Sequence, residues 1–423
     1  MRNWWVRAGV LAVLTAAAGQ AEERSAAATS PNPATELSGK VMTGYQGWFR
    51  CEGDGSNLGW MHYGGRDFSP GRCTIDLWPD VSEYGSSERF STKFKFADGR
   101  PAELFSSAIP ATVHRHFRWM RDYGIDGAFV QRFITSTRDE RMRASLDQVL
   151  ENCQIGAEKA GVLWGLMYDL TGSKADGPAR VMADWKRVRA ARRIEQDARY
   201  IRVGGKLLVA LWGLGFNDRE PHFDEWLQLI EFLRNDPEVG GCAVMLGVPA
   251  YWRTLDRDAV NDSRLHELMA RADVVSPWTV GRYTTVEAAL EHGERVWKAD
   301  EEWCHERKLH FLPVIFPGFS WHNLELSRGR AARLNAIPRA GGKFLWSQAV
   351  AAKRAGAEML YVAMFDELDE GTAIFKTTNN PPVGASAFLS ESGVASDHYL
   401  WLAGTIARML RGEAPADLEM PIR

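Results

Sequence analysis

Short apolar runs alternate with helix-like patterns along most of this chain, and this alternation limits the fold more than any other feature. The apolar runs predict eight strands, at 41–49, 125–133, 162–170, 206–214, 242–248, 274–280, 310–316 and 359–365. Helices are predicted between most of them and after the last one, at 112–122, 138–160, 179–200, 222–235, 256–271, 285–306, 342–355 and 397–410. Strict alternation favours parallel strands joined by right-handed crossovers. Eight such units favour an α/β fold of the closed (β/α)8 TIM barrel type.

An open, doubly wound sheet is the alternative, but no GxGxxG turn follows the first strand. A long polar segment, 50–110, rich in glycine and aromatic residues, separates the first strand from the first helix. Long loops in barrels tend to carry function. We therefore expect this loop after the first strand to contribute to a site.

The chain length of 423 residues suits one barrel of roughly 250 residues with extensions, so 39–423 is expected to be a single barrel domain. The net charge of -3 gives no indication of a nucleic-acid partner or of binding to an anionic membrane surface.

The first residues have the features of a secretory signal peptide, which we place at 1–21. Arg2 and Arg7 precede an apolar run at 10–18, and Gly19 and Ala21 are small residues at a cleavage-like site. Export to the periplasm or the medium is expected, with an uncleaved N-terminal anchor as the alternative; no other membrane contact is expected.

The segment 22–38, rich in proline, serine and alanine, is expected to be a disordered linker. Of five cysteines, Cys51 and Cys73 bracket one polar segment, and export would permit a disulfide there. None of the cysteines has zinc-site spacing.

An acidic cluster follows the last predicted strand. Asp366, Glu367, Asp369 and Glu370 directly precede Gly371, a turn signal. Parallel α/β barrels hold their chemistry at the carboxyl ends of strands, and two carboxylates are the groups that glycoside hydrolysis needs. Glu367 and Glu370 are therefore the candidate catalytic pair. A solvated acidic turn and a calcium-binding loop are the alternatives.

The other strand ends and the long loop carry aromatic and polar residues that suit a sugar. The strand ends contribute Tyr45, Gln46, Trp48, Gln131, Arg132, Tyr168, Asp169, Trp212, Asn217, Tyr251, Trp252, Trp278, Trp321 and His322. We select Tyr45, Trp48, Trp60, His62, Asp169, Trp212, Trp278, Asp366 and Asp369 as candidate substrate contacts. Each has a structural alternative: the tryptophans could fill the barrel top, Arg132 could pair with an acid, and Asp169 could cap a helix.

Two segments resemble a known family. FDELDEGTAIF, residues 365–375, resembles the FNEWHEGTxI segment of glycoside hydrolase family 99, the endo-α-mannosidase family. GYQGWF at 44–49, together with Trp60 and His62, resembles the YYxWY and W-H pattern near the start of that family. The layout of the chain also resembles the family 71/99-like group of barrels.

The resemblance implies roles for both glutamates. Glu367 would take the proton of a sugar 2-hydroxyl, and Glu370 would be the general acid/base, with retention through a 1,2-anhydro sugar. Asp366, Leu368 and Asp369 stand where the family has Asn, Trp and His, residues of which the last two contribute to the sugar pocket.

The sequence therefore predicts a secreted glycoside hydrolase that cleaves an α-linked oligosaccharide or polysaccharide and needs no cofactor, since two carboxylates and water suffice. A xylosidase or arabinosidase, an inverting α-1,3-glucanase and a non-catalytic carbohydrate-binding barrel are the alternatives.

Overall fold

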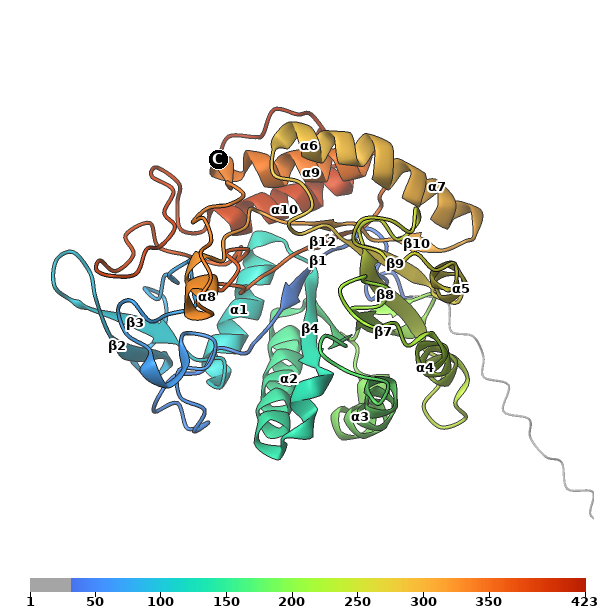
Figure 1. The fold of residues 1–423 in the computed structure, drawn as a ribbon, viewed down its shortest axis with the longest axis horizontal. Coiled ribbons are helices and arrows are strands. Elements are labelled where there is room, and N and C mark those ends of the chain that lie inside the picture. Colours follow the sequence, from blue (N-terminus) through green and yellow to red (C-terminus); the bar gives the residue numbers. More distant parts are fainter. Residues whose placement is uncertain (1–31) are drawn as a thin grey trace, which may run out of the picture. The chain divides into compact units, whose positions relative to one another are not determined.

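A ring of parallel strands forms the centre of the protein in the computed structural model, which describes residues 32–423 (Figure 1). In spatial order the strands are β10 (His310–Phe311), β9 (Val274–Trp278), β8 (Ala243–Pro249), β7 (Lys206–Trp212), β5 (Leu163–Asp169), β4 (Gly127–Phe133), β1 (Val41–Tyr45), β12 (Leu360–Val362) and β11 (Val314–Ile315). A short strand, β6 (Arg202–Val203), pairs with β7 in antiparallel fashion. All eight predicted strands are present.

One chain segment closes the ring. β10 pairs with β9, while β11, only a few residues later, pairs with β12. Between them the Leu312 N–H donates to Val275 O, and Pro313 O accepts from Tyr361 N–H. Pro313 has no N–H to donate, which interrupts the ladder at the point where the segment changes partner. The predicted (β/α)8 barrel is confirmed, and the open sheet is excluded.

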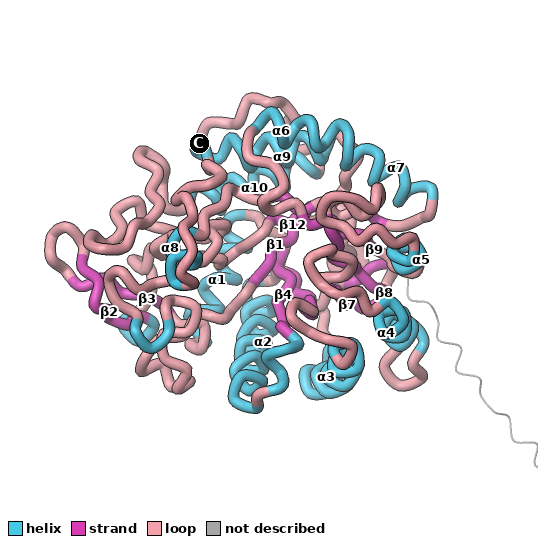
Figure 2. The backbone as a smooth tube through the Cα atoms, viewed as in Figure 1, coloured by secondary structure: helices cyan, strands magenta, loops and turns pink. Residues whose placement is uncertain are grey.

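The helices lie around the outside of the strands (Figure 2). They are α1 (Pro110–Tyr123), α2 (Glu140–Ala160), α3 (Gly177–Arg192), α4 (Phe223–Asn235), α5 (Arg264–Met269), α6 (Val286–His292), α7 (Lys298–Glu306), α8 (His322–Ser327), α9 (Lys343–Arg354) and α10 (His398–Leu410). A π-helical turn, Gly293–Trp297, joins α6 to α7, so the predicted helix 285–306 is continuous. Since helices cover the outside and side chains fill the inside, strands such as β5 and β8 are buried throughout.

The prediction of a helix at 256–271 is wrong over the first half of that range. The helix there is α5 alone, because Leu255 and Arg257 adopt positive φ angles of 54° and 52°. The Asp258 carboxylate accepts the N–H groups of Ala250 and Tyr251 at 3.0 and 3.1 Å and stabilises a turn instead. A second difference is the antiparallel hairpin β2 (Arg89–Lys95) and β3 (Pro101–Phe105), which lies inside the long loop and was not predicted.

The predicted signal peptide and most of the predicted linker lie outside the described residues. The end of that linker, 32–38, is packed rather than disordered. Leu37 is 1% exposed, and the Glu36 carboxylate accepts the N–H groups of Gly204 and Gly205. None of the helices within 32–423 combines the length and the apolar character that a membrane span requires.

The disulfide expected between Cys51 and Cys73 is not formed. All five cysteines are buried free thiols. The Cys51 thiol lies 3.1 Å from Phe105 O, and the Cys73 thiol lies 3.2 Å from Ser386 Oγ. The two thiols therefore pack against different parts of the chain, although they bracket one segment of the sequence.

Candidate active site

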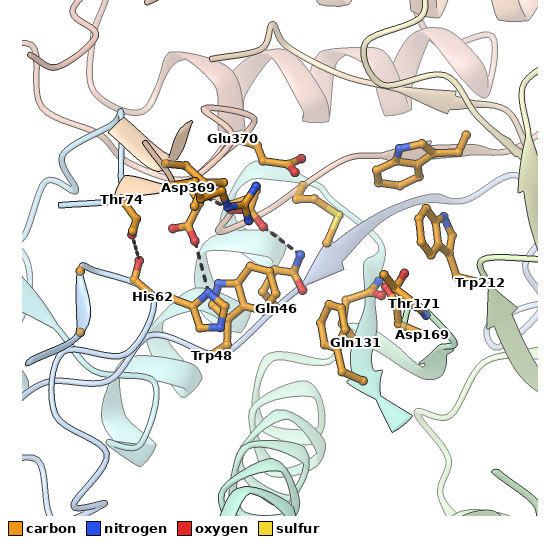
Figure 3. A pocket seen from close by; sticks show the side chains of 18 of the residues that line it. Gln46, Trp48, His62, Thr74, Gln131, Asp169, Thr171, Trp212, Asp369 and Glu370 are labelled. Atoms are coloured by element: carbon orange, nitrogen blue, oxygen red, sulfur yellow. Dashed lines mark hydrogen bonds and ion pairs between the residues drawn. The ribbon is translucent and has the colours of Figure 1, made fainter. Parts of the chain in front are cut away.

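A cavity of about 590 Å³ opens at the carboxyl ends of the strands, where the barrel architecture predicts the site. Its lining combines Gln46, Trp48, His62, Gly64, Gly65, Thr74, Gln131, Phe133, Asp169, Thr171, Trp212, Arg219, Trp278, Leu324, Arg328, Tyr361, Met364, Glu367, Asp369 and Glu370. Figure 3 shows Gln46, Trp48, His62 and Asp369 on one side, and Asp169, Thr171 and Trp212 on the other. The candidate pair Glu367 and Glu370 both line it.

Asp366 does not reach this cavity, which corrects its assignment as a substrate contact. Its side chain is fully buried, and its two oxygens accept the N–H groups of Gln46 and Gly47 at 2.7 and 2.8 Å. Burial raises the pKa of Asp366 to about 7, although these two hydrogen bonds favour the ionised form. Asp366 therefore ties the end of β12 to the start of the loop after β1.

Glu367 is held in one orientation. Its oxygens accept from Gln46 Nε2 at 2.9 Å and from the Asp369 N–H at 3.0 Å, and the residue is 2% exposed. Burial, followed by the charges of Asp369 and Glu370, raises the pKa of Glu367 well above its usual range. In its ionised form, a buried carboxylate with fixed oxygens and a raised proton affinity is a strong base toward a substrate group.

Asp369 is paired with the long loop. Its Oδ2 lies 3.2 Å from His62 Nδ1, while Asp369 itself is 5% exposed. Burial raises the pKa of Asp369, and the hydrogen bond and charge of His62 act in the opposite direction. The Trp60 and His62 segment was selected as one candidate group, but only His62 of the two reaches the cavity.

Glu370 is only partly buried, and its carboxylate forms no hydrogen bond within the described part of the chain. Its backbone oxygen accepts the Ser320 N–H at 2.9 Å, which fixes the residue while leaving the side chain open to the cavity. Burial and then the charge of Asp369 raise the pKa of Glu370 to about 7, and Arg328 lowers it. A carboxylic acid that still holds its proton near neutral pH is what general acid catalysis needs.

Trp48 stacks on two other aromatic rings. The His62 ring stacks on it with a centroid distance of 3.8 Å and an angle of 5°, and Phe133 stacks on it at 5.2 Å and 25°. These two rings occupy part of the indole surface on which a sugar could otherwise stack.

The opposite wall is aromatic. Trp212 and Trp278 meet at 5.2 Å with an angle of 78°, and Trp278 contacts Tyr361 at 6.2 Å. Because the two rings are nearly perpendicular, the edge of one indole points toward the face of the other. Asp169, 6% exposed, closes this wall: it accepts the Thr171 N–H at 2.7 Å, and burial raises its pKa to about 6.

Four buried polar atoms on cavity-lining side chains have no hydrogen-bond partner within 32–423. They are Gln46 Oε1, Trp48 Nε1, Trp212 Nε1 and Asp369 Oδ1. Buried polar groups are normally paired, because leaving one unpaired costs about 1–3 kcal/mol. All four atoms are enclosed by neighbouring side chains, so a ligand in the cavity would reach them only if those side chains moved.

Two other candidate contacts are structural. Tyr45 is fully buried and bonds His116 Nδ1 through its hydroxyl at 2.8 Å. Trp60 is 8% exposed and packs against Tyr63 and Phe68. Both residues build the layer beneath the cavity, and neither lines it.

Most of the unselected strand-end residues are occupied elsewhere. Arg132 bonds Asp184 at 2.6 Å, as its structural alternative predicted, and Tyr168 donates to the same carboxylate at 3.0 Å. Trp252 is buried, and His322 Nδ1 bonds Ala332 O at 2.6 Å. Gln131 does line the cavity, where it donates to the Tyr361 hydroxyl at 3.0 Å.

Sequence reasoning missed two cations of the cavity. Arg219 follows β7, so the strand-end rule that selected Asn217 could have found it; it donates to Asp218 at 2.7 Å and lies over Trp212. Arg328 follows α8 and bonds Glu325 at 2.9 Å, and no local pattern marks it. Its charge acts on Glu370, as described above.

The acidic cluster does not have the arrangement of a calcium loop. Asp366 turns to backbone N–H groups, and Asp369 turns to His62. Within 32–423 no three His, Cys, Asp or Glu side chains are arranged so that they could hold a metal ion.

No protein-family model matches the sequence, and no curated protein matches it. Solved structures do match in fold. The GH99 endo-α-mannosidase from Bacteroides thetaiotaomicron in complex with Bis-Tris-propane superimposes with a TM-score of 0.63 at 17% identity, over 89% of this chain and 98% of that chain. A second structure of that enzyme gives 0.64 at 16% identity over the same shares. A glycoside hydrolase-like protein gives 0.50 at 12% identity, over 81% and 98%. The chain therefore has the same barrel fold as this endo-α-mannosidase.

Proposed function

We propose that this protein is a glycoside hydrolase that cleaves an α-linked glycan in the manner of an endo-α-mannosidase. The observation that carries the proposal is Glu370, a partly exposed carboxylic acid in the cavity whose pKa is raised to about 7. It lies beside the fixed, buried carboxylate of Glu367. The fold shared with the endo-α-mannosidase supports the proposal as analogy.

In the proposed reaction Glu370 donates its proton to the glycosidic oxygen as the bond to C1 breaks. Following the family resemblance, Glu367 takes the proton of the 2-hydroxyl, and that oxygen attacks C1 to form a 1,2-anhydro sugar. Glu370, now ionised, then removes a proton from water, which attacks C1 and opens the anhydro ring, while Glu367 returns its proton to the 2-oxygen. Both glutamates end in their starting protonation states.

The two walls of the cavity suit the two kinds of sugar surface. An apolar ring face would lie against Trp212 and Trp278, and hydroxyl groups would face Gln46 and His62 on the other side (Figure 3). Aromatic platforms with a few fixed polar groups are typical of carbohydrate sites.

A non-catalytic sugar-binding barrel is the second candidate function. It would need no protonated acid, and its glutamates would be exposed with ordinary pKa values. The burial of Glu367 and the raised pKa of both glutamates favour the hydrolase. Export through the N-terminal signal is part of the proposal and rests on the sequence alone.

Product release from a panel of α-mannan, α-1,3-glucan, xylan, arabinan and aryl α- and β-glycosides tests the proposal. We expect α-mannan to be cleaved by the wild type and not by Glu370→Gln. Cleavage of the xylan or arabinan substrates would instead identify a xylosidase or arabinosidase, and cleavage of α-1,3-glucan would identify a glucanase. Binding without hydrolysis in both proteins would identify the binding barrel.

A further inference from the structure

The contact between His62 and Asp369 joins the long loop after β1 to the acidic loop after β12. These residues are 307 positions apart in the sequence. Asp369 is 5% exposed, and its Oδ1 has no partner within 32–423, so the Nδ1 contact through Oδ2 is its one side-chain hydrogen bond there. An ionised carboxylate can only accept, so the ring nitrogen that faces it carries the hydrogen.

The His62 ring is held from three directions. Its face stacks on Trp48 at 3.8 Å, and its Nδ1 meets Asp369. Its backbone, at a φ of 61°, is secured by the Thr74 hydroxyl, which donates to His62 O at 2.7 Å. Figure 3 shows this chain of contacts, with Thr74, His62 and Asp369 in sequence. A ring fixed at its face, one nitrogen and its backbone keeps its other nitrogen in one place.

That other nitrogen, Nε2, forms no hydrogen bond within the described chain, although His62 lines the cavity. With the hydrogen on Nδ1, a neutral ring presents the Nε2 lone pair as an acceptor. A sugar hydroxyl in the cavity can donate its hydrogen to this nitrogen.

We propose that Asp369 is a positioning residue that holds His62 as the Nδ1–H tautomer, so that His62 Nε2 accepts a hydrogen bond from a substrate hydroxyl in the cavity that Glu370 also lines. This deepens the proposed function and rests on it for the nature of the substrate.

Nitrogen NMR of the histidine rings tests the first half without any need for hydrolysis. In protein labelled with ¹⁵N-histidine, at a pH where the ring is neutral, we expect His62 to carry its hydrogen on Nδ1. In Asp369→Asn we expect it to move toward Nε2. His305→Phe, an exposed position outside the site, is the control and should leave the His62 signals unchanged. A wild-type ring with its hydrogen on Nε2, or a tautomer that Asp369→Asn does not alter, overturns the proposal.

Titration with methyl α-mannoside and its derivatives that each lack one hydroxyl tests the second half. His62→Phe keeps a ring to stack on Trp48 and removes Nε2. For the wild type, we expect one deoxy derivative to bind with about tenfold lower affinity than methyl α-mannoside itself. For His62→Phe, we expect that derivative and methyl α-mannoside to bind with equal affinity. Equal losses in both proteins for every derivative, or no binding by either, overturn the assignment.

The two proposals can fail separately. If His62 is the Nδ1–H tautomer and one deoxy derivative binds more weakly as expected, but the protein hydrolyses no substrate, only the hydrolase proposal is refuted. If hydrolysis depends on Glu370 but the His62 tautomer is unchanged in Asp369→Asn, only the proposed role of Asp369 and His62 is refuted.

Discussion

The backbone N–H of Gln46 donates to the carboxylate of Asp366 at 2.7 Å. This bond connects the loop after the first strand, β1, to the loop after the last strand, β12, beside the active site. The Gln46 side chain then donates to Glu367 at 2.9 Å. A fully buried residue thus sets the position of a loop, and that loop orients a candidate catalytic carboxylate. Asp366 acts through Gln46, without contact to the cavity.

Asp366→Asn should therefore destabilise the fold. An asparagine can accept only one of the two N–H bonds and turns its own donors toward the other. We expect a loss of about 2–3 kcal/mol in the free energy of unfolding, measured by urea denaturation. Asp98→Asn, which removes one partner of the exposed ion pair with Arg100, is the control and should cost much less. Equal stability of Asp366→Asn and the wild type would contradict the supporting role.

Glu370→Gln should lose activity according to the leaving group. With a poor leaving group, which needs protonation, we expect kcat/KM to fall about 10²–10⁴-fold. With a dinitrophenyl glycoside, which needs little protonation, the loss should be much smaller, whereas Glu367→Gln should lose activity on both. Glu358→Gln, exposed at the opposite end of β12, serves as the control. The same loss for both leaving groups in Glu370→Gln would contradict its role as general acid.

The pH dependence of kcat/KM should respond in opposite directions to two substitutions. A general acid works when protonated, so activity should fall as the pH rises through the Glu370 pKa of about 7. Asp369→Asn removes a charge that raises this pKa, so the fall should begin at lower pH. Arg328→Gln removes a charge that lowers it, so the fall should begin at higher pH. Alkaline limbs that coincide in all three proteins would contradict this electrostatic control.

Glu370→Gln should also stabilise the protein, and increasingly so at higher pH. The raised pKa means that the folded state prefers protonated Glu370, so its favourable contribution is complete below a pH of about 4.3 and is lost as the pH rises through about 7. Glutamine is neutral throughout. We expect almost no difference from the wild type at pH 4 or below, and a gain of about 1–3 kcal/mol at pH 8, measured by urea denaturation at both pH values. A gain that is equal at both would show that ionisation is not its cause.

Local sequence patterns predicted the fold well because they reflect local geometry. A strand buried on both faces, such as β5 or β8, must be apolar along its whole length, and a helix between strands must repeat its apolar face every 3.6 residues. The helix prediction failed where the backbone departs from a regular period: positive φ angles at Leu255 and Arg257 exclude the first half of the helix expected at 256–271. The hairpin β2–β3 inside the long loop was also not predicted.

By itself the sequence determined the barrel and placed a carboxylate cluster at the end of its last strand. Only the tertiary structure divided that cluster into different tasks: Asp366 supports the loop after β1, Asp369 pairs with His62, and Glu370 opens to the cavity. The physical reason is distance along the chain. Strand and helix patterns follow from neighbours a few residues away, whereas the burial, hydrogen bonds and pKa of each carboxylate depend on groups that lie hundreds of residues away in sequence and meet only when the barrel closes.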